Sequence, residues 1–380
     1  MKKSNLKIFI SAGEPSGDMR GAELLRELKK IMPEASFFGF GGDLMAKEGV
    51  RLVEHIKNLS IVGVFEALKK LPDIRRHYFQ AMFEVEKEKP SCAILIDYPG
   101  FNLKIAKLLK TKGIPVIYYI IPQVWAWGVS RVELLKRYTD KILVLFKFEE
   151  EFLKKYEVTA HFTGHPIVDN FAKQADIFKN DNLAGRRSIA LLPGSRKCEI
   201  KNLLPVMLES AKVIQSRMRD VSFVLAKASV ISSELYDEYL KEYPFLNISS
   251  VVDNTLYALS RADFAIAASG TVTLEVALTK KPFIIVYKSS IFTELCFNLF
   301  VRIPFLGLPN IIAGEEVVPE ILQRKFKPDV IADRVIEVLT NSVLYSDIQK
   351  KLTKVSLALG PTGASVRTAK LIADFLSSKF

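Results

Sequence analysis

The feature that most constrains the fold of this 380-residue chain is an alternation of short apolar runs with longer segments of helical periodicity. The alternation occurs in both halves, and it is typical of parallel strands covered by helices on both faces. In the first half it predicts strands at residues 6–12, 37–40, 92–96, 116–121 and 142–146. In the second half it predicts strands at residues 188–192, 222–226, 248–252, 264–267 and 283–287.

A polar, turn-rich stretch at residues 176–182 separates the two alternations and predicts a linker. The length also suggests two domains, at roughly 150 residues per domain. We therefore expect an α/β protein with two Rossmann-like domains facing a cleft, at residues 1–170 and 185–345. Helices at residues 346–380 are expected to pack back on the first domain or on a partner subunit.

The charge balance favours an anionic partner. Lys and Arg number 54 against 42 Asp and Glu, a formal net charge of +12. Such a charge suits nucleic acid, a phosphorylated substrate or an acidic membrane surface. Because no zinc-ligand spacing or RNA-binding aromatic motif accompanies it, we expect no nucleic-acid partner. The cysteines, at 92, 198 and 296, form no C-x-x-C pair, so neither a disulfide framework nor a zinc site is indicated.

The sequence contains no segment that we expect to be a signal peptide or a membrane span. Lys2 and Lys3 precede only a short apolar run that ends in a polar loop. The uncharged stretch at residues 113–130 contains Pro115 and Pro122, and its centre is better explained as a buried strand. A cytoplasmic location is therefore expected.

One loop of the second half has the composition of a diphosphate site. Gly194, Ser195 and Arg196 follow a predicted strand and precede a helix. A glycine that allows close approach, a hydroxyl, unpaired helix amides and a guanidinium together suit a diphosphate. The alternative is a capped turn with a surface arginine.

A second loop of this half repeats the plan of strand, small polar turn and helix. It contains Ser269, Gly270 and Thr271, and Glu275 follows on the first turns of the helix. The Glu275 carboxylate could accept both hydroxyls of a ribose. Alternatively, it only complements the helix dipole.

In the first half, the loop at residues 11–18 occupies the position where doubly wound folds bind ligands. It lacks the G-x-G-x-x-G pattern, so a dinucleotide cofactor is disfavoured, and we expect no cofactor. The alternative is a tight turn capped by Ser16 or Asp18. The candidate site residues of this loop are Glu14, Ser16, Gly17 and Asp18.

Asp97 ends another predicted strand, a position that suits a general base, although it could instead bond neighbouring amides. Trp125 and Trp127 follow a further strand and suit sugar stacking or core packing. The chain has no Asp-x-Asp pair, and His161 and His165 flank Gly164 rather than sharing a helix face, so we expect no metal site.

Several segments, in this order, resemble the lipid-A-disaccharide synthase family. They are SAGEPSGD at 11–18, GFGGDLMAKEG at 39–49, IDYPGFN at 96–102, PQVWAWG at 122–128, LLPGSR at 191–196 and SGTVTLE at 269–275. Each motif alone is weak, but the combination is specific and spans nearly the whole chain. Many members carry a second aspartate in the IDYPGFN motif, often taken as the catalytic base, where this chain has Gly100.

The resemblance implies an inverting, two-domain glycosyltransferase of the GT-B type. Such an enzyme transfers 2,3-diacylglucosamine from UDP-2,3-diacylglucosamine to 2,3-diacylglucosamine 1-phosphate, forming a β-1,6 disaccharide 1-phosphate and UDP. The first domain would face the acceptor and lipid, and the second would bind the UDP-sugar. The alternatives are another enzyme that uses UDP-N-acetylglucosamine, such as a 2-epimerase or polyprenyl-acceptor transferase, and a non-catalytic peripheral lipid-binding protein.

The resemblance also implies roles for individual residues. Arg196 would contact the diphosphate, Glu275 the ribose, and Asp97 or Glu14 would remove the proton. The rest of the donor site would comprise Gly194, Ser195, Ser269, Gly270, Thr271 and Asn310. The acceptor side would be lined by Ser16, Gly17, Asp18, Trp125 and Trp127.

Because both implied substrates are acylated, we expect contact with an anionic membrane on the inner face of the inner membrane of a Gram-negative-type bacterium. Two apolar segments with basic residues, 64–78 and 291–308, suit this contact. The alternative for each is a core-packed helix with a basic rim. The candidate contact residues are Phe65, Leu68, Leu71, Phe297 and Phe300. A homodimer is compatible with the sequence, which does not indicate the oligomeric state.

Overall fold

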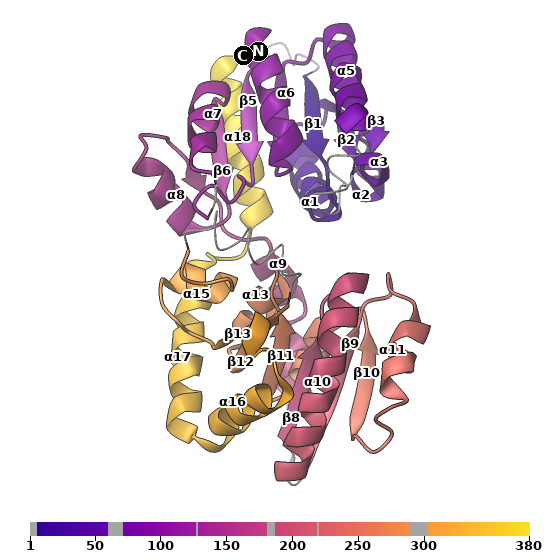
Figure 1. Ribbon diagram of the computed structural model, residues 1–380. Coiled ribbons are helices and arrows are strands. Elements are labelled where there is room, and N and C mark those ends of the chain that lie inside the picture. The colour runs from indigo at the N-terminus through magenta and orange to yellow at the C-terminus, as the bar shows by residue number, and fades with distance from the viewer. Residues whose placement is uncertain (1–5, 60–70, 127, 181–186, 219, 289–302) are drawn as a thin grey trace. The chain divides into compact units, whose positions relative to one another are not determined.

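The computed structural model describes residues 6–59, 71–126, 128–180, 187–218, 220–288 and 303–380. The chain forms two compact units (Figure 1). The first comprises Met1–Pro166 and Pro361–Phe380, and the second comprises Ile167–Gly360. Each unit is an α/β fold built on a parallel sheet, as the alternation of apolar runs and helical segments predicted.

The sheet of the first unit has the strand order β3-β2-β1-β4-β5-β6-β7. Its strands are β1 Lys7–Ala12, β2 Ser36–Gly41, β3 Arg51–His55, β4 Cys92–Ile96, β5 Val116–Tyr119, β6 Lys141–Val144 and β7 His161–Phe162. The five predicted strands are confirmed. We did not predict β3 and β7, because β3 is polar and only partly buried and β7 has two residues.

Helices cover this sheet on both faces, because its central strands are apolar on both faces. They are α1 Pro15–Ile31, α2 Asp43–Lys47, α3 Ile56–Leu59, α5 Leu71–Glu88, α6 Pro99–Thr111, α7 Ser130–Tyr138, α8 Lys147–Lys154 and α18 Ala364–Lys379. The chain returns to this unit through α18, which packs against α1 and is drawn in yellow in Figure 1.

The sheet of the second unit has the order β10-β9-β8-β11-β12-β13. Its strands are β8 Arg187–Leu192, β9 Val221–Lys227, β10 Ile248–Val252, β11 Phe264–Ala268, β12 Phe283–Tyr287 and β13 Glu320–Leu322. The five predicted strands are again confirmed, and β13, with three residues, was not predicted. Its helical elements are α9 Ile167–Lys173, η1 Ala175–Asn180, α10 Lys197–Arg217, α11 Ser233–Leu240, α12 Thr255–Ser260, α13 Val272–Thr279, α15 Leu308–Ala313, η2 Gln323–Lys325, α16 Pro328–Thr340 and α17 Ser342–Ala358.

Two predictions about chain organisation are wrong in part. The expected linker at residues 176–182 is a 3-10 helix as far as residue 180, since Phe178 packs its ring against Phe171 and the core of the second unit. The helices at residues 346–380 do not return together, because α17 buries Ile348, Leu352 and Val355 in the second unit's core.

The strand order of each sheet reverses direction at one place. In the first unit the chain moves outward from β1 to β3 and then crosses to β4 on the other side of β1. In the second unit the same change occurs between β8 and β11. Doubly wound folds bind ligands beyond the carboxyl ends of the strands at such a switch point. Among the described helices, none has both the length and the apolar character needed to cross a membrane.

Candidate active site

Two predicted carboxylates lie at the switch point of the first sheet. Glu14 is an exposed residue between β1 and α1, and Asp97 is a partly buried residue directly after β4. Burial and, to a smaller extent, the negative charge of Glu14 together raise the pKa of Asp97 to about 6, although a hydrogen bond from the Tyr98 amide opposes them. A carboxylate with a pKa near neutrality is well suited to act as a general base.

The backbone around Asp97 is strained. Asp97 and Tyr98 both have left-handed φ angles, +46° and +49°, and Ile120 at the end of neighbouring β5 has +63°. A β-branched residue such as isoleucine is a true outlier in this region. Non-glycine residues held in this conformation cost roughly 1–3 kcal/mol each and cluster at functional sites. The strain therefore supports a functional role for this edge of the sheet.

A hydrogen-bond network holds the strained turn. The buried Asn102 side chain donates from Nδ2 to the carbonyls of Asp97 at 2.8 Å and Ile96 at 3.1 Å, and its Oδ1 accepts from the Ser11 hydroxyl at 2.7 Å. The Tyr118 hydroxyl donates to the same Asp97 carbonyl at 2.8 Å. Asn102 thus joins the ends of β1 and β4 and fixes the position from which Asp97 acts. The sequence contained Asn102 within a motif but offered no sign of this role.

The loop before α1 requires small residues. A Cβ at Gly13 would collide with the ring of Tyr98, and one at Gly17 would lie 3.2 Å from the Ala12 Cβ. Ser16 is exposed in the first turn of α1. Gly13 therefore allows the loop to approach the Asp97 turn closely, and Gly17 allows the first turn of α1 to pack closely on Ala12.

Asp18, predicted to line the acceptor side, instead faces the protein interior. It is 4% exposed, and its carboxylate accepts hydrogen bonds from the amides of Gly42 at 2.8 Å, Met45 at 3.0 Å and Leu44 at 3.1 Å. It therefore holds the start of α2, where unpaired amides need acceptors.

Trp125 is half-buried, and its Nε1 donates to Glu149 Oε1 at 3.2 Å. Its ring meets that of Phe148 edge-on at 5.1 Å between centroids. The indole is thus held by a hydrogen bond and an aromatic contact. Part of its surface stays exposed, which is needed for a sugar ring to stack on it. Trp127 lies outside the described residues.

Glu149 is a buried carboxylate that the motifs of the sequence did not indicate. It lies in the first turn of α8, where its Oε2 also accepts from the Phe146 amide at 3.2 Å. Burial, with a smaller contribution from the charge of Asp97, raises its pKa to about 7, against the hydrogen bonds that it accepts. Its signal in the sequence, an acidic residue in the first turn after a strand, is shared by many structural caps.

The predicted diphosphate loop of the second unit connects β8 to α10. Gly194 has a φ of +101°, and a Cβ there would collide with the Glu199 carboxylate. Glu199 Oε2 accepts from the amides of Ser195 at 3.0 Å and Arg196 at 3.2 Å, and Arg196 Nη1 donates to Glu199 Oε1 at 3.2 Å. The carboxylate of Glu199 thus accepts hydrogen bonds from the amides that were predicted to bind an anion. The Arg196 side chain is 71% exposed.

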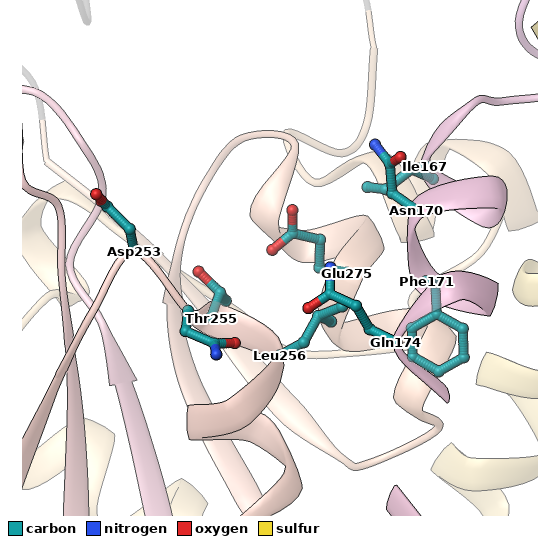
Figure 2. A pocket seen from close by; sticks show the side chains of 9 residues that line it. Ile167, Asn170, Phe171, Gln174, Asp253, Thr255, Leu256 and Glu275 are labelled. Atoms are coloured by element: carbon teal, nitrogen blue, oxygen red, sulfur yellow. The ribbon is translucent and has the colours of Figure 1, made fainter. Parts of the chain in front are cut away.

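The second predicted donor loop follows β11. Gly270 has a φ of +156°, and its carbonyl accepts from the Thr273 hydroxyl at 2.7 Å, while Thr271 is exposed and Ser269 is partly buried. Glu275, one turn along α13, lines a pocket of about 200 Å³ with Gln174 and further residues. Figure 2 shows Glu275 between Asp253 and Thr255 on one side and, on the other, Asn170 of α9 and Gln174, which follows that helix. These side chains could bind a ligand that has several hydroxyls.

Asn310, predicted to contact the nucleotide, is fully buried. Its Nδ2 donates to the Val318 carbonyl and Glu320 Oε1, both at 2.8 Å, and its Oδ1 accepts from the amides of Val317 at 2.8 Å and Val318 at 3.0 Å. All its hydrogen-bonding groups are used within the protein. Asn310 therefore joins α15 to the segment before β13 instead of offering a free amide to a ligand.

Four predicted membrane-contact residues, Phe65, Leu68, Phe297 and Phe300, lie outside the described residues, as does the side chain of Leu71.

In the described part of the chain, no group of three or more His, Cys, Asp or Glu residues could hold a metal ion. His165 is buried, which together with the charge of Arg20 lowers its pKa to about 3, so it is neutral at pH 7.

Comparison with known proteins decides the family. The model of the lipid-A-disaccharide synthetase family matches residues 8–372. The chain belongs to this lipid-A-disaccharide synthase family. A lipid-A-disaccharide synthase from Coxiella burnetii (strain RSA 331 / Henzerling II) is 38% identical over 382 residues, covering 99% of this chain and 100% of that protein. One from Geobacter sulfurreducens (strain ATCC 51573 / DSM 12127 / PCA) is 36% identical over 379 residues, covering 98% of both. The predicted family and enzyme class, a glycosyltransferase, are confirmed.

Solved structures confirm the GT-B type of fold. The glycosyltransferase of kitacinnamycin has a TM-score of 0.65 at 16% identity, covering 97% of this chain and 98% of that one. A UDP-GlcNAc 2-epimerase from Neisseria meningitidis, solved with UDP-GlcNAc, has a TM-score of 0.59 at 11% identity, covering 98% and 99%. Because a transferase and an epimerase share this fold, the fold alone does not identify the reaction of a lipid-A-disaccharide synthase family member.

Proposed function

We propose that this chain transfers 2,3-diacylglucosamine from UDP-2,3-diacylglucosamine to the 6-hydroxyl of 2,3-diacylglucosamine 1-phosphate. The products are a β-1,6-linked disaccharide 1-phosphate and UDP. The match to the family over residues 8–372 is the main support for this substrate pair. The position of Asp97 at the switch point of the first sheet supports it on chemical grounds.

On the acceptor side, Asp97 accepts the proton of the attacking hydroxyl as the new bond to the anomeric carbon forms and the bond to UDP breaks. A single displacement of this kind inverts the anomeric centre and needs no covalent sugar intermediate. Gly100 leaves this chain without the second aspartate of many family members, and a Cβ there would meet nothing within 4 Å. Asp97 therefore acts without that neighbour, and the Glu14 charge that raises its pKa makes it a stronger base.

On the donor side, Arg196 and the amides at the start of α10 neutralise the departing diphosphate. Glu199 holds the same amides in this structure, so the diphosphate displaces its carboxylate or shares the loop with it. Glu275 accepts the ribose hydroxyls from its place in the pocket of Figure 2. The arginine and the helix amides take the place of a metal, so we propose that catalysis needs none.

We further propose that the protein binds peripherally to the inner face of the inner membrane, where acylated substrates are found. The net charge of +12 supports attraction to an anionic surface. The segments at 64–78 and 291–308 remain the proposed contacts.

The test of the proposed reaction is analysis of its product. Purified protein is incubated in detergent with both acylated substrates, with and without EDTA, and the product is examined by mass spectrometry and NMR. We expect a disaccharide 1-phosphate with a β-1,6 linkage, formed at nearly the same rate in EDTA. A different linkage, or no product from this acceptor, would contradict the assignment. Loss of activity in EDTA that Mg²⁺ restores would contradict the metal-free mechanism alone.

A further inference from the structure

The first unit has a groove between α5 and α6, which lie side by side in Figure 1. Its volume is about 560 Å³. Its lining combines the apolar side chains of Ile74 and Leu108 and the ring of Tyr78 with three cations, Arg75, Lys104 and Lys107, and it includes Thr111 at one end of α6. The three cations are exposed, whereas Leu108 is buried. We call this feature the α5–α6 groove.

The positive charge of the groove is not neutralised by the acids of its two helices. Helix α6 contains no acidic residue. Every acidic residue of α5 is paired with a cation outside the groove: Asp73 with Arg76 at 3.6 Å, Glu84 with Arg51 at 2.9 Å, Glu86 with Lys112 at 2.7 Å and Glu88 with Lys7 at 2.9 Å. Among the residues that the structure describes, no carboxylate forms an ion pair with a cation of the groove. As far as the described residues go, the three charges are therefore available to an external anion.

Exposed aromatic rings continue the row that starts at the groove. Arg75, Phe79 and Phe83 follow one another at intervals of four residues along α5 and so lie on one face of the helix. Phe79 is 47% exposed and Phe83 is 64% exposed, and the Arg75 guanidinium lies over the Phe79 ring at 5.6 Å. Cations beside exposed aromatic rings are typical of helices that lie in a membrane interface.

We propose that the α5–α6 groove binds the phosphate headgroup of an acidic phospholipid, while Phe79 and Phe83 enter the interface of the bilayer. The apolar side chains of Ile74 and Leu108 favour an amphiphile over a soluble nucleotide. The polar groups of a nucleotide's ribose and base would lose hydrogen bonds to water against these side chains and gain none in return. The proposal rests on the membrane association proposed above, and it adds a defined site with a defined ligand class. The cations from α6 extend the contact beyond the segment predicted from the sequence.

The test compares two triple variants that lose the same charge. The groove variant replaces Arg75, Lys104 and Lys107 with Gln. The control variant replaces Lys47, Lys154 and Lys155, three exposed lysines of the same unit, with Gln. Sedimentation is measured with vesicles of phosphatidylcholine that contain or lack phosphatidylglycerol. Each basic residue at an anionic surface contributes about fivefold, so we expect the groove variant to lose roughly 100-fold in partitioning, and the control variant about threefold or less.

Further measurements distinguish a specific headgroup site from the effect of net charge. A Lys104→Arg/Lys107→Arg variant should bind like wild type, and thermal unfolding of all variants should match. Equal loss in both triple variants would show that net charge alone acts and would overturn the site. A groove variant that loses single-stranded RNA binding as strongly as vesicle binding would also overturn it, in favour of a general polyanion surface. UDP release from detergent-solubilised substrates should be unchanged in the groove variant. If the proposed reaction is wrong, wild type itself will fail to release UDP in this assay. The vesicle result does not depend on that outcome.

Discussion

Asp97→Asn is expected to lower turnover by about 10²–10⁴-fold, the usual contribution of a positioned general base. Asparagine has nearly the same shape but cannot accept the proton of the acceptor hydroxyl. The variant should fold, because the hydrogen bonds that hold this turn are made to the Asp97 carbonyl by Asn102 and Tyr118. Steady-state rates with both acylated substrates measure the loss.

The pH dependence should identify Asp97 as the group responsible. Its pKa is raised to about 6, so it takes up a proton as the pH falls through 6, and kcat/KM of wild type should fall with it. The same raised pKa means that protonated Asp97 stabilises the fold below its unfolded pKa of about 4 and that this stabilisation is lost as pH rises through 6. Asp97→Asn should therefore be no less stable than wild type at pH 7.

Glu14→Gln is the matched control. It removes the charge that raises the Asp97 pKa, so the acid limb of the wild-type profile should move to lower pH while most of the turnover remains. If Glu14→Gln were severely damaging and Asp97→Asn were not, Glu14 would be the base and Asp97 a structural residue.

Arg196→Ala is expected to weaken use of the donor by at least about tenfold. Hydrogen bonds to a charged group contribute about 1.5–3 kcal/mol each, and the guanidinium can make two to a diphosphate. The folded state should be little affected, because the side chain is 71% exposed and pairs only with Glu199 among the described residues. Calorimetric titration with UDP and kcat/KM for the donor measure the effect.

Arg217→Ala serves as the control for this change. Arg217 is at the other end of α10 and pairs with Asp329 and Asp333 on the surface, where such pairs contribute little to stability. This variant should bind UDP like wild type. Wild-type affinity and turnover in Arg196→Ala would exclude the loop after β8 as the diphosphate site.

The sequence predicted nine largely buried strands because burial on both faces makes a strand mostly apolar. It also predicted β10, which has no buried residue and is recognised by its β-branched residues. It did not predict β3, whose sequence Arg-Leu-Val-Glu-His alternates only partly, or the two- and three-residue strands β7 and β13. Their pairing depends on neighbouring strands rather than on their own residues. The same limit explains why η1 was predicted as a linker.

At the site, the sequence located loops better than side-chain roles. The loops after β1, β4, β8 and β11 were predicted from turns that follow apolar runs. The roles of Asp18 and Asn310 depend on amides far along the chain or in other elements, which no local pattern reveals. Glu149 was missed for the same reason, since its importance comes from burial beside Trp125.

Acceptor-dependent UDP release tests the central claim most directly. The protein is supplied with UDP-2,3-diacylglucosamine in detergent, and UDP is measured with and without 2,3-diacylglucosamine 1-phosphate. We expect rapid release only when the acylated acceptor is present, and we expect UDP-N-acetylglucosamine to be a poor donor. UDP release from UDP-N-acetylglucosamine without any acceptor, or release that a polyprenyl phosphate supports equally well, would contradict the proposed reaction.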